Sequence, residues 1–268
     1  MKAILSSGNP FYKELARISD SARQRNKSNQ TLLDGAHLLA AYLDSGNQPR
    51  HILLNGEVPN EGEIALLLQR AKDVPVTRLD GRLFAGLSEL KSPGGIIALI
   101  DLPQPEGAIA DCSFPLLLED IQDPGNLGSM LRSAAAAGCD AAFLSPGCAD
   151  AWSPKVLRAA MGGHFLMRIC ERQDLPAVAS AYPGMLLATG PNARHSLFDC
   201  DLRGKVAFLI GNEGAGLSEE LQSLATHQIS IPMRGKIESL NVAAAAAICL
   251  FEAVRQRAGL NLEKHKAP

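Results

Sequence analysis

Short apolar runs alternate with helix-like segments along the whole chain of 268 residues. In the second half, such runs stand at 114–118, 141–144, 206–210 and 227–231. Strands that alternate with helices predict an α/β fold with a mostly parallel sheet. Because such sheets bind ligands at the carboxyl ends of their strands, the alternation also indicates where a site should lie.

Residues 101–113, DLPQPEGAIADCS, interrupt this alternation. Two prolines, a glycine and three acids over 13 residues are typical of a linker. We therefore predict a smaller N-terminal α/β domain over 1–100 and a second domain over 114–268. The first is expected to hold helices at 10–28, 36–45 and 61–71, and strands at 51–54, 74–77 and 95–100.

The net charge of −2 argues against a protein that binds nucleic acid through bulk charge alone. The charge is unevenly spread, since residues 11–27 hold five Lys or Arg and two acids. This basic run is either a solvated helix face or a surface for phosphates. The chain offers no apolar run of about 18 residues and no signal-peptide pattern, which predicts a cytoplasmic protein with no membrane partner.

The cysteines are scattered, without a CxxC pair or a Cys/His cluster at metal spacing. We expect no metal site, and buried thiols of a reducing compartment. The six cysteines stand at 112, 139, 148, 170, 200 and 249.

Three segments of the second half begin where an apolar run ends. The first is LEDIQDPGNLGSMLRSAAAAG, residues 118–138, in which DPGN is a helix-start signal. Asn126 and Arg132 are six residues apart in it, and Arg132 is the one cation of residues 101–150, which hold eight acids. The arginine either neutralises local carboxylates or awaits an anionic substrate.

The second segment is FLIGNEGAGLSEE, residues 208–220. It lacks the lysine of a phosphate-binding P-loop, and its glycines fall as GxxGxG rather than GxGxxG. By itself it is either a nucleotide loop or plain turn geometry. An oxidoreductase of the dinucleotide-binding class would need GxGxxG after its first strand, which is absent.

The third segment is ISIPMRGKIESLNVAAAAAICLFEAV, residues 229–254. A strand ends near Pro232, and a polar loop leads to a helix predicted over 239–256 with Ser239 as its N-cap. Five alanines at 243–247 favour a helix and would let another backbone, or a subunit, approach closely.

In this order, the patterns N-x-G-x-x-x-R, G-N-E-G-x-G-L and I-P-M-x-G-x-x-x-S-L-N-V resemble the three motifs of the SpoU/TrmH family. This family of the SPOUT superfamily methylates the ribose 2′-oxygen of RNA. The resemblance covers about residues 113–258. On SGNPFYKELARI and LLDGAHLLAAYL, the first half resembles the family's frequent L30e-like RNA-binding extension.

The resemblance implies a C-terminal parallel-sheet domain with a deep trefoil knot, which binds S-adenosylmethionine among three loops. It assigns catalysis to Arg132 and Asn126, supported by Glu213, Ser239 and Asn241. The implied cofactor-binding residues are Thr189, Gly190, Ile210, Gly211, Asn212, Gly216, Ile231, Pro232, Met233 and Leu240.

The same resemblance implies a homodimer formed through the knotted domain, and ribosomal RNA as substrate, with transfer RNA as the alternative. A catalytically inactive RNA-binding relative is a further alternative. This alternative predicts that Asn126 or Arg132 is replaced by another residue, and both residues are present. One departure stands at Ala243, where the family often has serine.

Overall fold

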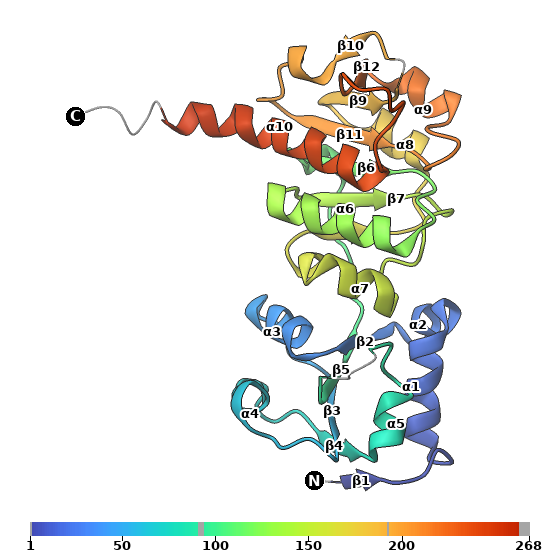
Figure 1. Ribbon diagram of the computed structural model, residues 1–268, viewed down its shortest axis with the longest axis vertical. Helices are drawn as coiled ribbons and strands as arrows, with labels where there is room; N and C mark the ends of the chain where they lie inside the picture. The colour runs from blue at the N-terminus through green and yellow to red at the C-terminus, as the bar shows by residue number, and fades with distance from the viewer. Residues whose placement is uncertain (1, 91–93, 192, 263–268) are drawn as a thin grey trace, which may run out of the picture. The chain divides into compact units, whose positions relative to one another are not determined.

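The computed structural model describes residues 2–90, 94–191 and 193–262. The chain divides into two compact units. The first comprises Met1–Gln104 and Trp152–Phe165, and the second comprises Pro105–Ala151 and Leu166–Pro268. Each unit is built around one sheet with helices packed on it (Figure 1).

The sheet of the first unit has the strand order β1-β4-β3-β5-β2. It is mixed, because β5 runs antiparallel to both β3 and β2. The prediction of a mostly parallel arrangement was therefore wrong for this unit. The chain enters β5 at the end where β3 finishes, since the Asn55 N–H donates to the Gly95 carbonyl. The strands are β1 (Lys2–Ile4), β2 (Gln30–Asp34), β3 (His51–Asn55), β4 (Val76–Leu79) and β5 (Ile96–Asp101).

The helices of the first unit are α1 (Pro10–Asp20), α2 (Ala22–Ser28), α3 (Ala36–Asp44), α4 (Gly62–Arg70), α5 (Gly81–Ala85) and α7 (Pro154–Ala160). The single helix predicted over 10–28 is two, because Ser21 is extended and accepts a hydrogen bond from the Gln24 N–H at the start of α2. Arg25 is buried and donates to the carbonyls of Ile18 and Ser19, both at 2.7 Å. These bonds satisfy carbonyls at the end of α1 that lack helical partners.

The segment Trp152–Phe165 stands between two strands of the second unit in sequence, yet it packs into the first. Thr31, which is fully buried, donates its hydroxyl to the Trp152 carbonyl at 2.8 Å. The Trp152 ring is also buried and lies 5.0 Å from the ring of His164. This differs from the domain predicted over 114–268, because the apolar side chains of the segment find their burial in the first unit.

Within its described residues, the second unit holds seven strands that are all parallel, in the order β10-β12-β9-β11-β6-β7-β8. This confirms the parallel sheet predicted for the second half. Its central strands are buried at every residue, as expected of a sheet covered on both faces. The strands are β6 (Pro115–Leu118), β7 (Ala141–Leu144), β8 (Arg168–Cys170), β9 (Met185–Thr189), β10 (His195–Ser196), β11 (Val206–Ile210) and β12 (His227–Ser230).

The α-helices of the second unit are α6 (Pro124–Ala137), α8 (Leu175–Ser180), α9 (Glu219–Leu224) and α10 (Val242–Leu262). Short 3-10 turns stand at Ile109–Asp111, Gly163–Phe165 and Leu197–Asp199, the second of them in the first unit. Helices α6 and α10 lie side by side (Figure 1).

Capping explains where α6 and α10 begin. Asp123 accepts the Asn126 N–H at 2.8 Å and Pro124 occupies the first turn, so α6 starts within the predicted DPGN signal. The predicted N-cap Ser239 was wrong. Asn241 caps α10 instead, since its Oδ1 accepts the N–H groups of Ala243 and Ala244 at 3.0 and 3.2 Å.

Burial keeps the cysteine thiols protonated. It raises the pKa of Cys112 to about 11 and those of Cys139 and Cys249 to about 12, and all six cysteines are free. Within the described residues, no helix combines the length and apolar character needed to cross a membrane.

We predict that Thr31→Val lowers the free energy of unfolding by about 0.5–1.5 kcal/mol, because it removes the hydroxyl that donates to the buried Trp152 carbonyl. Chemical denaturation of the full chain measures this change. Ser45→Ala is the control, since its hydroxyl donates over a similar 2.7 Å to the Tyr42 carbonyl only three residues away. Equal losses in the two variants would contradict a special role for the 152–165 segment.

Candidate active site

The strand order brings four loops of the second unit together. Strands β12, β9, β11 and β6 are consecutive neighbours and parallel, so their carboxyl ends meet at one edge. Strands β6 to β8 fill one side of the sheet and β9 to β12 the other, so the order reverses between β6 and β11. Such a reversal point is where open α/β sheets bind ligands.

Three predicted catalytic residues from distant parts of the chain form a hydrogen-bonded row at this edge. The Asn126 amide donates from Nδ2 to Oε1 of Glu213 at 3.0 Å. Asn241 donates from Nδ2 to Oδ1 of Asn126 at 2.9 Å. Because Oδ1 of Asn241 already accepts the backbone of α10, its Nδ2 must be the donor, which in turn orients the Asn126 amide.

The other two predicted catalytic residues, Arg132 and Ser239, stand outside this row. Arg132 is exposed on α6, about 9 Å further along the helix axis than Asn126. Among the described residues its guanidinium has no hydrogen bond or ion pair, which favours a role with an external anion over neutralisation of local carboxylates. Ser239 is exposed in the loop before α10.

The glycine-rich loop after β11 is a tight turn. A β-carbon on Gly211 would lie 2.3 Å from the Gly216 backbone, and Gly216 has a φ of +72°. Asn212 and Gly216 exchange two backbone hydrogen bonds of 3.0 Å. Both glycines are thus required by the loop itself. Gly214 is not, because a β-carbon there would meet only Asn212 Oδ1, at 3.5 Å.

The remaining predicted cofactor residues lie along the same edge. The Thr189 hydroxyl donates to the Leu209 carbonyl at 3.1 Å, and the Gly190 N–H donates to the Ile229 carbonyl at 3.0 Å. Ile210 is buried, Ile231 is half-buried, and Pro232 is exposed. Met233 and Leu240 are 40% and 38% exposed. Met233 and Leu240, in the loop between β12 and α10, therefore offer a surface for a flat apolar group.

Sequence reasoning missed two residues that contact the glycine-rich loop, Glu119 and Asp120. They follow β6 directly. The available signal was a pair of carboxylates at the end of a buried apolar run.

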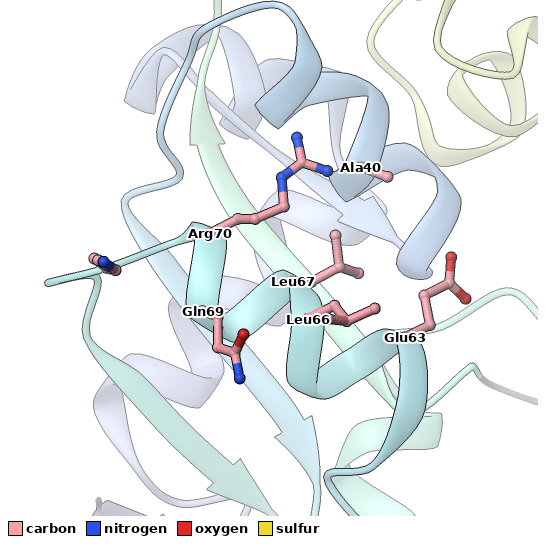
Figure 2. Close-up of a pocket in the computed structure, with 7 residues that line it drawn as sticks. Ala40, Glu63, Leu66, Leu67, Gln69 and Arg70 are labelled. Carbon is pink, nitrogen blue, oxygen red and sulfur yellow. The ribbon is translucent and has the colours of Figure 1, made fainter.

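A shallow hollow of the first unit holds no predicted site residue (Figure 2). It lies along α4, where Arg70 forms an ion pair with Asp44 at 2.6 Å. Its lining residues are Ala40, Glu63, Leu66, Leu67, Gln69, Arg70 and Lys72.

The profile of the SpoU rRNA methylase family matches residues 113–251, which include the parallel sheet and the row Asn126–Glu213–Asn241. The chain belongs to the SpoU rRNA methylase family. The profile of an MRM3-like substrate binding domain matches residues 9–98 of this family member.

Relatives of this SpoU chain agree over most of its length. A 23S rRNA (guanosine(2553)-2′-O)-methyltransferase, RlmP of Bacillus subtilis, is 32% identical and covers 94% of this chain and 98% of its own. The mitochondrial rRNA methyltransferase 3A of Danio rerio is 32% identical over 90% of this chain and 68% of its own. A crystal structure of the SpoU methyltransferase AviRb from Streptomyces viridochromogenes with AdoMet superposes with a TM-score of 0.84, at 27% identity, over 93% and 98% of the two chains.

We predict that Asn241→Ala and Asn241→Asp separate the two jobs of this side chain. Alanine removes the helix cap and costs about 1 kcal/mol of unfolding free energy, whereas aspartate keeps an oxygen for the cap. Both variants lack the Nδ2 donor to Asn126 and should slow methylation at least tenfold. Denaturation and single-turnover methylation measure the two effects. A fully active Asn241→Asp variant would show that the orientation of Asn126 is irrelevant.

Proposed function

We propose that this chain transfers a methyl group from S-adenosylmethionine to the 2′-hydroxyl of a ribose in ribosomal RNA. The observation that carries the proposal is the row Asn126–Glu213–Asn241 at the reversal point of the parallel sheet, in a chain of the SpoU family. The choice of ribosomal RNA is supported by the relatives of the chain, which are named as rRNA methyltransferases. One of them, RlmP, acts on a guanosine 2′-oxygen of 23S rRNA.

The chain is an S-adenosylmethionine-dependent RNA methyltransferase by family. In our proposal the cofactor binds at the edge of the sheet that carries the row Asn126–Glu213–Asn241. The residues that would hold it belong to the loops after β9, β11 and β12, where the exposed Met233 and Leu240 offer apolar surface to an adenosine. Glu213 has no cationic partner among the described residues, which suits a cationic sulfonium nearby. When bound, the cofactor supplies an activated methyl group.

The protein's own contribution is alignment and charge. Bringing two reactants together in the right geometry can be worth about 7–11 kcal/mol. A guanidinium offers five N–H donors and no acceptor, so Arg132 is not a simple general base. In our proposal Arg132 binds the phosphate beside the target ribose and stabilises negative charge that develops on the 2′-oxygen. Asn126, Glu213 and Asn241 orient the reacting groups. Ser239 supports them from the loop before α10, which also carries Asn241.

Two features of the fold belong to the proposal. The first is the trefoil knot of the second unit, supported by family membership and by the place of β11 between β6 and β9, which both precede it in the chain. The second is that the first unit is an L30e-like domain that binds the RNA, supported by its match to a substrate binding domain.

We also propose a cytoplasmic homodimer that forms through the knotted domain. Helix α10 supports this assembly, because its alanines at 243–247 are small and Phe251 is 46% exposed. Ribosomal RNA is preferred to transfer RNA as the substrate, on the names of the relatives.

We predict that Arg132→Lys lowers the rate of methyl transfer at least tenfold while RNA affinity stays within about threefold. A lysine keeps the charge but loses the planar, bidentate geometry that suits a phosphate. Single-turnover methylation and equilibrium RNA binding measure the two quantities. Arg203→Lys, on an exposed loop of the same unit, is the control. Near-full methylation by Arg132→Lys would refute the proposed role.

We predict that reversing the charges of Lys13, Arg17 and Arg23, all exposed on α1 and α2, weakens RNA binding and flattens its dependence on salt. The buried Arg25 is excluded because it holds α1. Binding isotherms at several salt concentrations make the measurement. The same reversal at Arg50, Arg70 and Lys72 is the control. Unchanged RNA binding in the first variant would show that this basic run is a solvated helix face and not a surface for phosphates.

A further inference from the structure

We infer that Glu119 and Asp120 are positioning residues that fasten both ends of the glycine-rich loop 211–218 to the end of β6. The inference rests on the proposed function, because it takes this loop as part of the cofactor site. The inference gives Glu119 and Asp120 a role in the reaction. Neither residue is among the catalytic or cofactor-binding residues that the three family motifs imply.

Glu119 holds the far end of the loop. Its Oε2 accepts the backbone N–H of Ser218 at 2.7 Å. Ser218 is the N-cap of α9, and its hydroxyl accepts the Leu221 N–H. Since the hydroxyl is occupied by the helix, the carboxylate of Glu119 fixes the loop through the main chain, with a charge-assisted bond.

Asp120 holds the near end. Its carbonyl accepts Nδ2 of Asn212 at 2.8 Å. The other atom of that amide, Oδ1, accepts the N–H groups of Gly214 and Ala215 at 2.8 and 3.0 Å. One side chain therefore shapes the turn and ties it to β6.

Asp120 is itself held rigidly. Its φ of +53° is uncommon for a residue other than glycine. Ser145, buried after β7, donates its hydroxyl to Oδ1 of Asp120 at 2.5 Å and accepts the Asp120 N–H at 2.9 Å. A β-carbon on Gly147 would lie 2.2 Å from the same Oδ1, so the carboxylate is closely packed.

These attachments matter because Glu213 stands between the two held ends. Its Oε1 accepts from Asn126 at 3.0 Å, and a shift of the loop would break that contact. Constellations of this kind must be held to about 0.5 Å to work. Neither Glu119 nor Asp120 pairs with a cation in the part of the chain that the structure describes, so they act as hydrogen-bond acceptors.

The test compares Glu119→Ala with Glu119→Gln in the full-length protein, by titration with S-adenosylmethionine and with S-adenosylhomocysteine. Alanine removes the acceptor for Ser218, whereas the glutamine oxygen keeps it. We expect Glu119→Ala to raise both dissociation constants at least fivefold and Glu119→Gln to stay within about twofold of the wild type. If both variants lose affinity for the cationic ligand alone, Glu119 acts by charge and the positioning role is overturned.

Asp140→Ala is the matched control. Asp140 precedes β7 at the opposite edge of the sheet, and its Oδ2 accepts the N–H groups of Ser113 and Phe114. The variant should unfold at a lower temperature and bind both ligands as the wild type does. Weakening equal to that of Glu119→Ala would mean that lost stability explains both, which also overturns the inference.

Amide hydrogen exchange separates this inference from the proposed function. S-adenosylhomocysteine should slow exchange over 211–218 in the wild type and much less in Glu119→Ala. No protection in the wild type would refute the cofactor site, and the positioning role with it. Full protection in both proteins would refute the positioning role alone.

Discussion

The pairing of β6 with β11 is the interaction on which the rest of the second unit depends. Leu116 to Leu118 register with Phe208 to Ile210, so the two strands end side by side. Everything that follows them is thereby brought to one place: the acids after β6, the start of α6, and the glycine-rich loop after β11. Backbone hydrogen bonding in a buried core sets this register, and hence the positions of the polar side chains at the edge.

The chemistry of the site rests on oriented hydrogen bonds. The side-chain oxygen of Asn241 accepts from the first turn of α10, so its amide nitrogen donates to Asn126. Asn126 in turn donates to Glu213. Each bond fixes the direction of the next, so the row has one arrangement. Arg132 lies apart from this row, on α6, and makes no ion pair among the described residues, which supports the role with a substrate anion that we propose for it.

Much of the second unit followed from local pattern. The strands at 141–144 and 206–210 stand where the apolar runs predict them, because a buried strand carries its signal in a few adjacent residues. The mixed sheet of the first unit and the packing of 152–165 did not follow, because both depend on contacts such as Thr31 with Trp152, which are 121 residues apart.

The sequence by itself determined the α/β class, the parallel sheet of the second half, and, through its three motifs, the membership of the SpoU family. Only the tertiary structure decided that Asn241 rather than Ser239 caps α10, that Arg25 is buried in the basic run, and that Glu119 and Asp120 grip the glycine-rich loop. The physical reason is range. Helix and strand signals lie within a few residues, whereas a hydrogen-bond acceptor is chosen by whichever donor the folded chain brings within about 3 Å.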